Sequence, residues 1–364
     1  MILPSILSGG GLDNPAAHLA EGEVRLVARG RYGLDGDFRR FDTEKDDTYR
    51  VRTPGGDAFV LKIANPAESQ REIDFQVDLL RHIESAAPDL PVPRVVPDRQ
   101  GRLTSLHHAS DGSLRIVRVV SYLEGTPLDS TTSTPAERER VGEILGRLRL
   151  ATAGFRHSGE DRVLAWDVQH LMQLAPLVEG IDDATQRRRL EAGLARFARM
   201  TGGLATLRRQ VLHNDFSRSN IVVDHADPAF VKGIIDFGDA VRTAIAVDVS
   251  TALLNQLPAT PVEDAFGAGR DLLRGYLRVA DLTEEELALI PHLTMGRVIA
   301  RILLSHCLAR IFPQNATYVL RNTPPCWWQL GWFLDRDPEE VGAVFMPQSA
   351  ASPPPPARMT RTRP

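Results

Sequence analysis

The sequence predicts an α+β protein with two lobes: an N-terminal lobe of antiparallel sheet with one main helix, and a larger, mostly helical C-terminal lobe. Three observations support this prediction. Residues 23–121 contain short apolar runs separated by turn signals, whereas helical periodicity dominates residues 134–345. The length of 364 residues is also sufficient for a substantial core and suggests two lobes.

The N-terminal lobe is predicted to consist mostly of strands. Residues 1–22 are rich in Gly, Pro and small residues, and we expect them to be flexible. Strand-like runs follow at EVRLVA, FRRFDT, DTYRVRT and DAFVLKIA, and the sequence PGG between the last two predicts a hairpin. Apolar residues at helical spacing then predict a helix over residues 67–85. Two further runs, GRLTSL and LRIVRVVSYL, complete the predicted sheet.

A linker over residues 122–133 is expected to join the two lobes. The sequence TPAE after it is a helix-start signature, with Thr134 as the N-cap and Pro135 in the first turn. Helices are expected to dominate the chain from there, interrupted by strands and loops around residues 210–237. The tail, residues 346–364, is rich in Pro and poor in apolar residues, which predicts disorder.

Composition and charge argue against several classes of protein. A net charge of −4 provides no basic footprint for nucleic acid or for an anionic membrane. Two cysteines, Cys307 and Cys326, are too few for a disulfide scaffold or a thiolate zinc site. No apolar run reaches the length of a membrane span, and the N-terminus lacks a signal-peptide pattern. We therefore expect a cytoplasmic protein without nucleic-acid or membrane partners; its oligomeric state is unknown from the sequence.

A polar cluster separates two apolar runs in VLHNDFSRSNIVVD, residues 211–224. It holds His213, Asp215 and Asn220, and Asp236 follows in GIIDFGDA. Phosphoryl transfer from a nucleoside triphosphate needs an Asp beside the attacking hydroxyl, oxygen ligands for Mg²⁺ and a cation on the phosphates. Asp215 suits the first role, and Asn220 and Asp236 suit the metal, because such oxygen ligands fit Mg²⁺ better than zinc.

The pattern His-x-Asp-x-x-x-x-Asn followed by Ile-Asp-Phe-Gly-Asp resembles the aminoglycoside phosphotransferase and choline kinase superfamily, which has a bilobal protein-kinase-like fold. The likeness covers residues 40–335. It includes a first hairpin at YRVRTPGGDAFVLKIANPAE, an inter-strand segment at DLPVPRVV and a hinge at YLEGTPL. The segments VLAWDVQHL and YVLRNTPPCWWQL are most similar to the hydroxylysine kinase branch.

By this resemblance, Asp215 is the catalytic base, and Asn220 and Asp236 are the Mg²⁺ ligands. The phosphate donor is ATP or GTP. His213 shapes the catalytic loop by hydrogen bonding. The residue after it is usually Gly in the superfamily, but here it is Asn214, which tolerates positive φ better than most residues.

The resemblance also implies a nucleotide site in the N-terminal lobe. Lys62 holds the phosphates, and its place between apolar residues independently demands an anionic partner. The backbone of Ser121, Tyr122 and Leu123 receives the nucleotide base. The acid that would pair with Lys62 is not evident, because Gln76 stands at the position expected for it.

Three residues are candidates for binding the acceptor, which we expect to be a small molecule with a hydroxyl group. Asp239 either faces the acceptor or lies in a surface turn. Asp167 either binds the acceptor or caps a helix. Arg297 lies on a helix with a buried pattern, where packing and internal hydrogen bonds are the alternative role.

Three classes of function fit these motifs: a small-molecule kinase, a protein kinase and a catalytically silent relative. A protein kinase is disfavoured because no Ala-Pro-Glu sequence or long activation segment follows Asp236. The intact set of motif residues argues against a silent relative. Among acceptors, the Arg-rich, Pro-tailed chain slightly favours an antibiotic and a resistance function, as expected of a GC-rich genome. The alternative is a hydroxylated amino acid such as hydroxylysine or homoserine.

Overall fold

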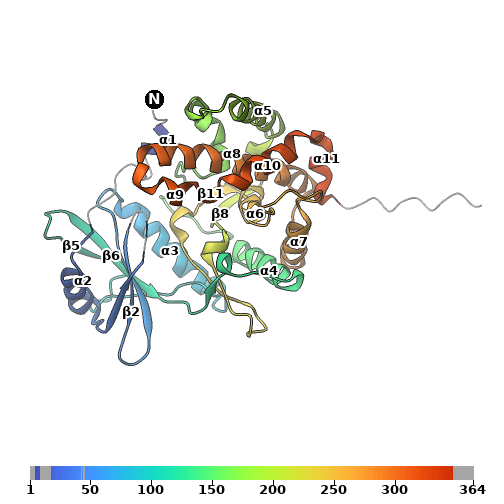
Figure 1. The fold of residues 1–364 in the computed structure, drawn as a ribbon. Coiled ribbons are helices and arrows are strands. Elements are labelled where there is room, and N and C mark those ends of the chain that lie inside the picture. Colours follow the sequence, from blue (N-terminus) through green and yellow to red (C-terminus); the bar gives the residue numbers. More distant parts are fainter. Residues whose placement is uncertain (1–4, 9–17, 42, 44–45, 347–364) are drawn as a thin grey trace, which may run out of the picture.

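The computed structural model describes residues 5–8, 18–41, 43 and 46–346. Figure 1 shows a sheet-containing lobe, coloured blue to teal, beside a larger helical lobe, coloured green to red. The predicted α+β class with two lobes is confirmed. The tail predicted to be disordered lies outside the described residues, apart from its first residue, Met346.

The N-terminal lobe is built on one antiparallel sheet. Its strands are β1 (Asp37–Arg40), β2 (Asp47–Arg52), β3 (Ala58–Ile63), β4 (Val95–Val96), β5 (Ser105–His108) and β6 (Leu114–Ser121). They run in the order β1-β2-β3-β6-β4, and β5 also pairs with β6. The hairpin predicted at PGG is confirmed, because β2 and β3 pair directly on either side of it.

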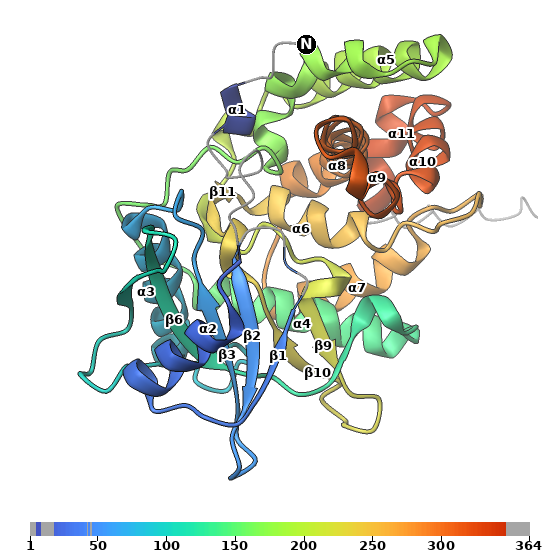
Figure 2. The ribbon, with the colours of Figure 1, turned by 60° about the vertical axis from the view of Figure 1, so that its left-hand side comes forward.

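Helices cover both faces of this sheet. One face is packed against α2 (Glu21–Val27) and the π-helical segment η1 (Ala28–Tyr32). The main helix, α3 (Gln70–Ala86), lies on the opposite side, as Figure 2 shows. The helix predicted over residues 67–85 is therefore confirmed, with its start three residues later.

The alternation of side chains along two strands brings two cations to the α3 side of the sheet. Leu61 and Ile63 are fully buried under α2, so Lys62 between them points the other way. Arg118 in β6 is the register partner of Lys62 in β3. Partners in an antiparallel pair share a face, so Arg118 and Lys62 lie side by side.

One predicted strand, EVRLVA at residues 23–28, is wrong. The segment forms α2 and the start of η1. Val24, Val27 and Ala28 are all buried against the sheet, and their spacing of three and four residues is that of a helix face. A six-residue apolar run does not distinguish a strand from a short helix, which explains the error.

The segment predicted to be flexible, residues 1–22, is only partly described. Its upper boundary is wrong, because α2 begins at Glu21. The described part also contains α1 (Ser5–Ser8), in which Ile6 and Leu7 are buried in the main apolar core.

Three of the described helices begin with capping boxes: α3, α4 (Pro135–Ala151) and α8 (Glu284–Ile311). In α3, the Ser69 side chain accepts a hydrogen bond from the backbone of Glu72, whose side chain caps in return. Thr134 and Glu137 do the same for α4, so the helix start predicted at TPAE is confirmed. Each box satisfies backbone donors that the first turn leaves without a partner.

The linker predicted at residues 122–133 is not plain coil. It contains the two-residue strand β7 (Thr126–Pro127) and the 3-10 turn η2 (Leu128–Ser130). β7 pairs with β9 (Ile221–Val223) of the C-terminal lobe. The linker is thus held against the lobe that carries the polar cluster.

The C-terminal lobe consists mainly of helices. Besides α4, these are η3 (Val168–Gly180), α5 (Ala184–Met200), α6 (Ile245–Leu254), α7 (Gly267–Val279), α8 (Glu284–Ile311), α9 (Ala316–Leu320), α10 (Pro324–Leu334) and α11 (Pro338–Gly342). α8 contacts α5, α6, η3, α10 and α11. By length and composition α8 could cross a membrane, so the expectation that no apolar run reaches that length is wrong. However, 89% of its most apolar window is buried in the lobe, which is typical of a core helix.

α4 and α7 approach closely through two glycines. A Cβ atom on Gly142 of α4 would lie 1.8 Å from the main-chain oxygen of Leu272. One on Gly275 of α7 would lie 1.8 Å from the main-chain oxygen of Glu139. Both contacts are with backbone, so any side chain at these positions forces the helices apart.

Short strands frame the polar cluster, as the sequence predicts. They are β8 (Arg209–Leu212), β9, β10 (Val231–Ile234) and β11 (Val241–Ala244). They form two small sheets, β10-β9-β7 and β11-β8. In Figure 2, β9 and β10 lie between the N-terminal sheet and the helices of the C-terminal lobe.

Candidate active site

The loop between β8 and β9 is tied to the segment after β10 through His213. Its Nε2 donates a hydrogen bond to the main-chain oxygen of Ile235 at 3.0 Å, and its Nδ1 accepts one from the backbone of Asp215 at 3.3 Å. Its ring also packs against Phe237, with 4.7 Å between ring centroids. His213 therefore fixes the two polar loops relative to each other.

Asn214 stands where the superfamily usually has Gly, and its backbone is left-handed, with φ at 60°. Asn is one of the few residues other than Gly that adopt this conformation readily, as expected from the sequence. Two buried charged side chains hold it. Its N–H donates to Asp248 Oδ1 in α6 at 2.7 Å, and its carbonyl accepts from Arg297 Nη2 in α8 at 2.7 Å. The left-handed residue is thus clamped by the core helices.

The carboxylate of Asp215 is oriented by Asn220. Asn220 Nδ2 donates to Asp215 Oδ2 at 2.7 Å and to its main-chain oxygen at 3.0 Å. Burial, and then the nearby carboxylate of Asp239, raises the pKa of Asp215 to about 6. At neutral pH the group is mostly ionised, and a carboxylate in that state can accept a proton.

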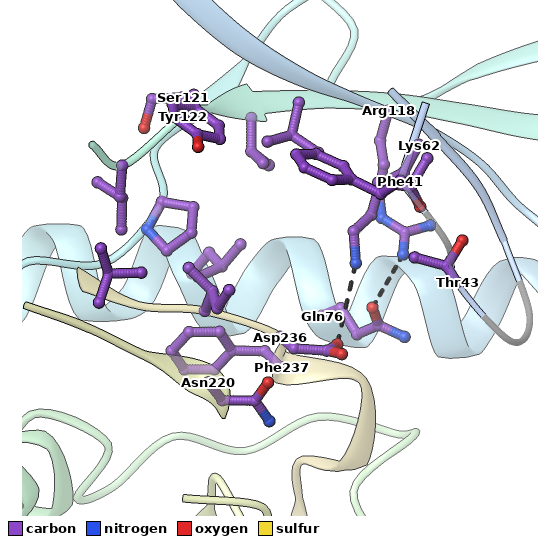
Figure 3. Close-up of a pocket in the computed structure, with 18 of the residues that line it drawn as sticks. Phe41, Thr43, Lys62, Gln76, Arg118, Ser121, Tyr122, Asn220, Asp236 and Phe237 are labelled. Carbon is purple, nitrogen blue, oxygen red and sulfur yellow. Dashed lines mark hydrogen bonds and ion pairs between the residues drawn. The ribbon is translucent and has the colours of Figure 1, made fainter. Parts of the chain in front are cut away.

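Asp236 follows β10 and lies at the edge of the pocket between the lobes, as Figure 3 shows. Its φ of 61° is left-handed, and Gly238 N–H donates to its carboxylate at 3.2 Å. Lys62 Nζ lies 3.9 Å from Asp236 Oδ1, and this ammonium lowers the pKa of Asp236. A backbone hydrogen bond of 2.9 Å from Ile235 to Asn220 joins the two loops.

The oxygen donors in this corner fit a hard divalent cation. Asn220 uses its Nδ2 on Asp215, which leaves Oδ1 for another partner, and Asp236 offers a carboxylate that faces the pocket. Within the described ranges, no group of three or more His, Cys, Asp or Glu is arranged to hold a metal. Two protein oxygens suit Mg²⁺, which commonly completes its shell with water and phosphate oxygens.

The pocket itself is a cavity of about 350 Å³ with walls from both lobes. One part of its lining is apolar: Val60, Leu80, Val120, Leu123, Val222 and Phe237. Another part is charged or polar: Lys62, Gln76, Arg118, Asn220 and Asp236. A ligand with a flat apolar group and an anionic group would match both parts.

The hinge residues differ in the backbone groups that they leave free. Ser121 N–H donates to the main-chain oxygen of Arg94 at 2.8 Å, and Tyr122 N–H to that of Ala58 at 3.0 Å. Leu123 N–H forms no hydrogen bond within the part of the chain that the structure describes. Of the three predicted base-binding residues, Leu123 therefore has the available N–H donor.

Gln76, which stands where an acid was expected, hydrogen-bonds Arg118, and no hydrogen bond joins it to Lys62 among the described residues. It is buried and accepts a hydrogen bond from Arg118 Nη2 at 3.1 Å. Arg118 Nη2 also lies 3.2 Å from Asp46 Oδ2. Among the described carboxylates, Lys62 forms an ion pair with Asp236 only.

The three candidate acceptor residues lie in different surroundings. Asp167 is fully buried and caps η3, accepting from the Gln169 backbone at 3.1 Å, so the capping alternative is confirmed. Arg297 is also buried, and its charge opposes the raised pKa of Asp215. Asp239 is partly exposed in the turn after Asp236. Their roles in acceptor binding stay predictions.

Two residues that hold this site were missed in the sequence. Asp248 lies in the apolar helix segment IAVDVSTALL, and Arg118 lies in the apolar strand LRIVRVVS. A charged residue between apolar neighbours needs a partner when it is buried, which is the argument that identified Lys62. The same signal was present at both positions.

Comparison with known proteins identifies the family. A model described as the phosphotransferase enzyme family matches residues 37–286. The chain belongs to this family. The resemblance stated from the motifs and the predicted enzyme class, a phosphotransferase with an alcohol acceptor, are confirmed.

Individual relatives agree with this assignment. The chain is 22% identical to hydroxylysine kinase of Bos taurus over 312 residues, which are 81% of this chain and 82% of that protein. It is 28% identical to homoserine kinase of Methylobacillus glycogenes over 257 residues, 70% of this chain and 75% of that protein.

A solved structure of an amicoumacin kinase in complex with AMP-PNP, Ca²⁺ and Ami has the same fold. Its TM-score is 0.63 at 19% identity, and the match covers 85% of this chain and 97% of that one. The protein-kinase-like fold predicted from the motifs is confirmed. Membership of the phosphotransferase enzyme family, with kinases among the relatives, makes the chain a small-molecule phosphotransferase that uses a nucleotide as its phosphate donor.

Proposed function

We propose that this phosphotransferase transfers the γ-phosphate of ATP or GTP to a hydroxyl group of a small acceptor, with Mg²⁺ as the metal. The observation that carries the proposal is the joint position of Asp215, Asn220 and Asp236, with Lys62 of the N-terminal lobe 3.9 Å from Asp236. These four groups supply a base, two metal ligands and a phosphate-binding cation, which phosphoryl transfer requires.

Asp215 accepts the proton of the acceptor hydroxyl. Asn220 holds its carboxylate at 2.7 Å, so the base does not need to reorient when the acceptor arrives. A pKa of about 6 keeps Asp215 ionised at neutral pH while leaving it basic enough to take a proton.

The nucleotide lies in the pocket between the lobes. Its base occupies the apolar part of the lining, next to the free N–H of Leu123, and its phosphates reach Lys62. Asn220 and Asp236 would hold Mg²⁺, which neutralises charge on the phosphates during transfer. Because Lys62 lies 3.9 Å from Asp236, the phosphates and the metal ligands share one corner of the pocket.

We propose a hydroxylated amino acid or a related amino alcohol as the acceptor. Two kinds of support favour this class over an antibiotic. The curated relatives include hydroxylysine and homoserine kinases, whereas the amicoumacin kinase at 19% identity supports the fold alone. Asp239 and Arg297 also surround Asp215 with charges of both signs, as an acceptor with an amine and a carboxylate requires.

A substrate screen tests this proposal. Release of nucleoside diphosphate would be followed with hydroxylysine, homoserine, choline, aminoglycosides and nucleoside antibiotics, each with ATP and with GTP. Preferred turnover of an amino acid hydroxyl supports the proposed acceptor class. Preferred turnover of an antibiotic instead supports the resistance function that the composition suggested.

A further inference from the structure

Arg118 lies in the phosphate end of the nucleotide pocket beside Lys62. The two residues are register partners in neighbouring strands, and both line the cavity. Figure 3 shows the side chains of Lys62 and Arg118 descending together from the sheet toward Asp236 and Gln76. The neighbours of Arg118 in β6, Val117 and Val119, are fully buried on the opposite face, so the strand fixes its direction.

Of the two terminal nitrogens of the Arg118 guanidinium, Nη2 has hydrogen-bond acceptors among the described residues and Nη1 has none. The residue is 5% exposed, and its Nη2 is shared between Asp46 at 3.2 Å and Gln76 at 3.1 Å. Its Nη1 is buried and has no hydrogen-bond partner in the part of the chain that the structure describes. A buried, charged donor without an acceptor is costly, so this nitrogen is suited to an acceptor that arrives with a ligand.

The charge balance points to an anionic ligand. An acid at the position of Gln76 would neutralise a cation in this corner, but the amide of Gln76 is neutral. Among the described residues, Lys62 and Arg118 contribute two positive charges to this corner and Asp46 one negative charge, which leaves one positive charge before Asp236 is counted. Asp236 is committed to the metal in the proposed reaction, so the excess charge remains for the phosphates.

We propose that Arg118 is a second phosphate-binding cation of this pocket, donating Nη1 to a phosphate oxygen beyond the α-phosphate of the bound nucleotide. Gln76 and Asp46 hold Nη2 and thereby fix the plane of the guanidinium. A planar, permanently charged fork of this kind binds phosphate with more directional hydrogen bonds than an ammonium does. The inference rests on the proposed nucleotide site.

The test compares nucleotides that differ only in their phosphates. Binding of ADP, AMP and adenosine (or the guanine series, if the protein prefers it) would be measured by calorimetry with Mg²⁺ and without acceptor. Arg118→Met should weaken ADP binding by about 10- to 100-fold, the worth of a charge-assisted hydrogen bond, and leave adenosine binding within about twofold. Arg118→Lys, which keeps the charge but loses the fork, should fall between wild type and Arg118→Met.

Two further variants separate a local effect from a general one. Gln76→Glu supplies the missing carboxylate and should weaken ADP binding while Arg118 is intact. Arg29→Met removes an exposed arginine paired with Asp35, away from the pocket, and should bind ADP like wild type. If Arg118→Met does not fold, as judged by its thermal unfolding, then Arg118→Lys and Gln76→Glu carry the test.

The outcomes distinguish this inference from the proposed function. A wild-type protein that binds neither ADP nor GDP overturns the nucleotide site and the inference with it. If the wild type binds ADP and the folded variants bind it equally well, only the role of Arg118 is overturned. Equal loss of ADP and adenosine binding would show that Arg118 merely supports the fold of the pocket, which also contradicts the inference.

Discussion

The side-chain amide of Asn220 donates a hydrogen bond to the carboxylate of Asp215 at 2.7 Å. The residue proposed to bind the metal thus also orients the proposed base. Because the Asn220 side chain both donates to the Asp215 carboxylate and is proposed to bind the metal, the geometry of the base and that of the metal site are linked. Changes at either residue should therefore affect catalysis more than nucleotide binding.

Asp215→Asn should lower kcat by about 10² to 10⁴, the usual range for general acid–base catalysis. The substitution keeps the size of the side chain, and its new amide oxygen can still accept from Asn220. The Kd for nucleotide and the thermal unfolding temperature should stay close to the wild-type values. Steady-state kinetics together with nucleotide calorimetry checks this, and turnover near that of the wild type contradicts the base role.

Asp236→Ala should abolish Mg²⁺-dependent turnover, because it removes the one carboxylate proposed to bind the metal. Titration of activity with Mg²⁺ checks the prediction. Asp227→Ala is the matched control: it removes a carboxylate paired with Lys232 in the turn between β9 and β10 and should leave the titration unchanged. A Mg²⁺ dependence that survives in Asp236→Ala would mean that the metal lies elsewhere.

Gly142→Ala or Gly275→Ala should destabilise the C-terminal lobe by about 1–3 kcal/mol or more, since each new methyl meets backbone of the facing helix. Chemical denaturation measures the change in the free energy of unfolding. Gly22→Ala in α2 is the control, because a Cβ there meets nothing within 4 Å. If the first two variants are as stable as the Gly22 variant, the close approach of α4 and α7 is refuted.

His292 in α8 should make stability depend on pH. Burial lowers its pKa to about 4, from an ordinary value of 6.5. The folded state therefore favours the neutral ring: its full stability is present above pH 6.5 and is lost as the pH falls toward 4. The loss over this range is about 3 kcal/mol, because each pKa unit is worth about 1.4 kcal/mol.

The free energy of unfolding would be measured between pH 4 and pH 8 for wild type, His292→Gln and His108→Gln. His292→Gln should show a shallower decline below pH 6.5, whereas His108→Gln, at an exposed position, should follow the wild type. Identical slopes in wild type and His292→Gln would show that His292 does not titrate as its burial implies.

The site and the fold were predictable to different degrees. Asp215, Asn220 and Asp236 belong to local motifs, so their order along the chain was enough to suggest their chemistry. The strand β3 was equally clear in the sequence, because Lys62 stands between two apolar residues at alternating positions. These residues, Leu61 and Ile63, lie on the one buried face that this alternation predicts. The run EVRLVA, at the end of α2 and the start of η1, was misread because its six residues carry both strand-like composition and helical spacing.

The partners of buried charges could not be predicted, because they depend on tertiary packing. Gln76 was placed opposite Lys62 by its position in the helix, but in the structure it contacts Arg118 from the neighbouring strand. Asp248 reaches Asn214 from a helix 34 positions further along the chain. The sequence shows that such charges need partners, and only the fold shows which ones.

Product analysis tests the central claim most directly. Wild type and Asp215→Asn would be incubated with nucleoside triphosphate, Mg²⁺ and the best acceptor from the screen, and the products analysed by mass spectrometry and ³¹P NMR. The account predicts a phosphate ester on the acceptor hydroxyl that forms with the wild type, requires Mg²⁺ and is almost absent with Asp215→Asn. Equal ester formation by both proteins, or hydrolysis of the nucleotide without any phosphorylated acceptor, would contradict it.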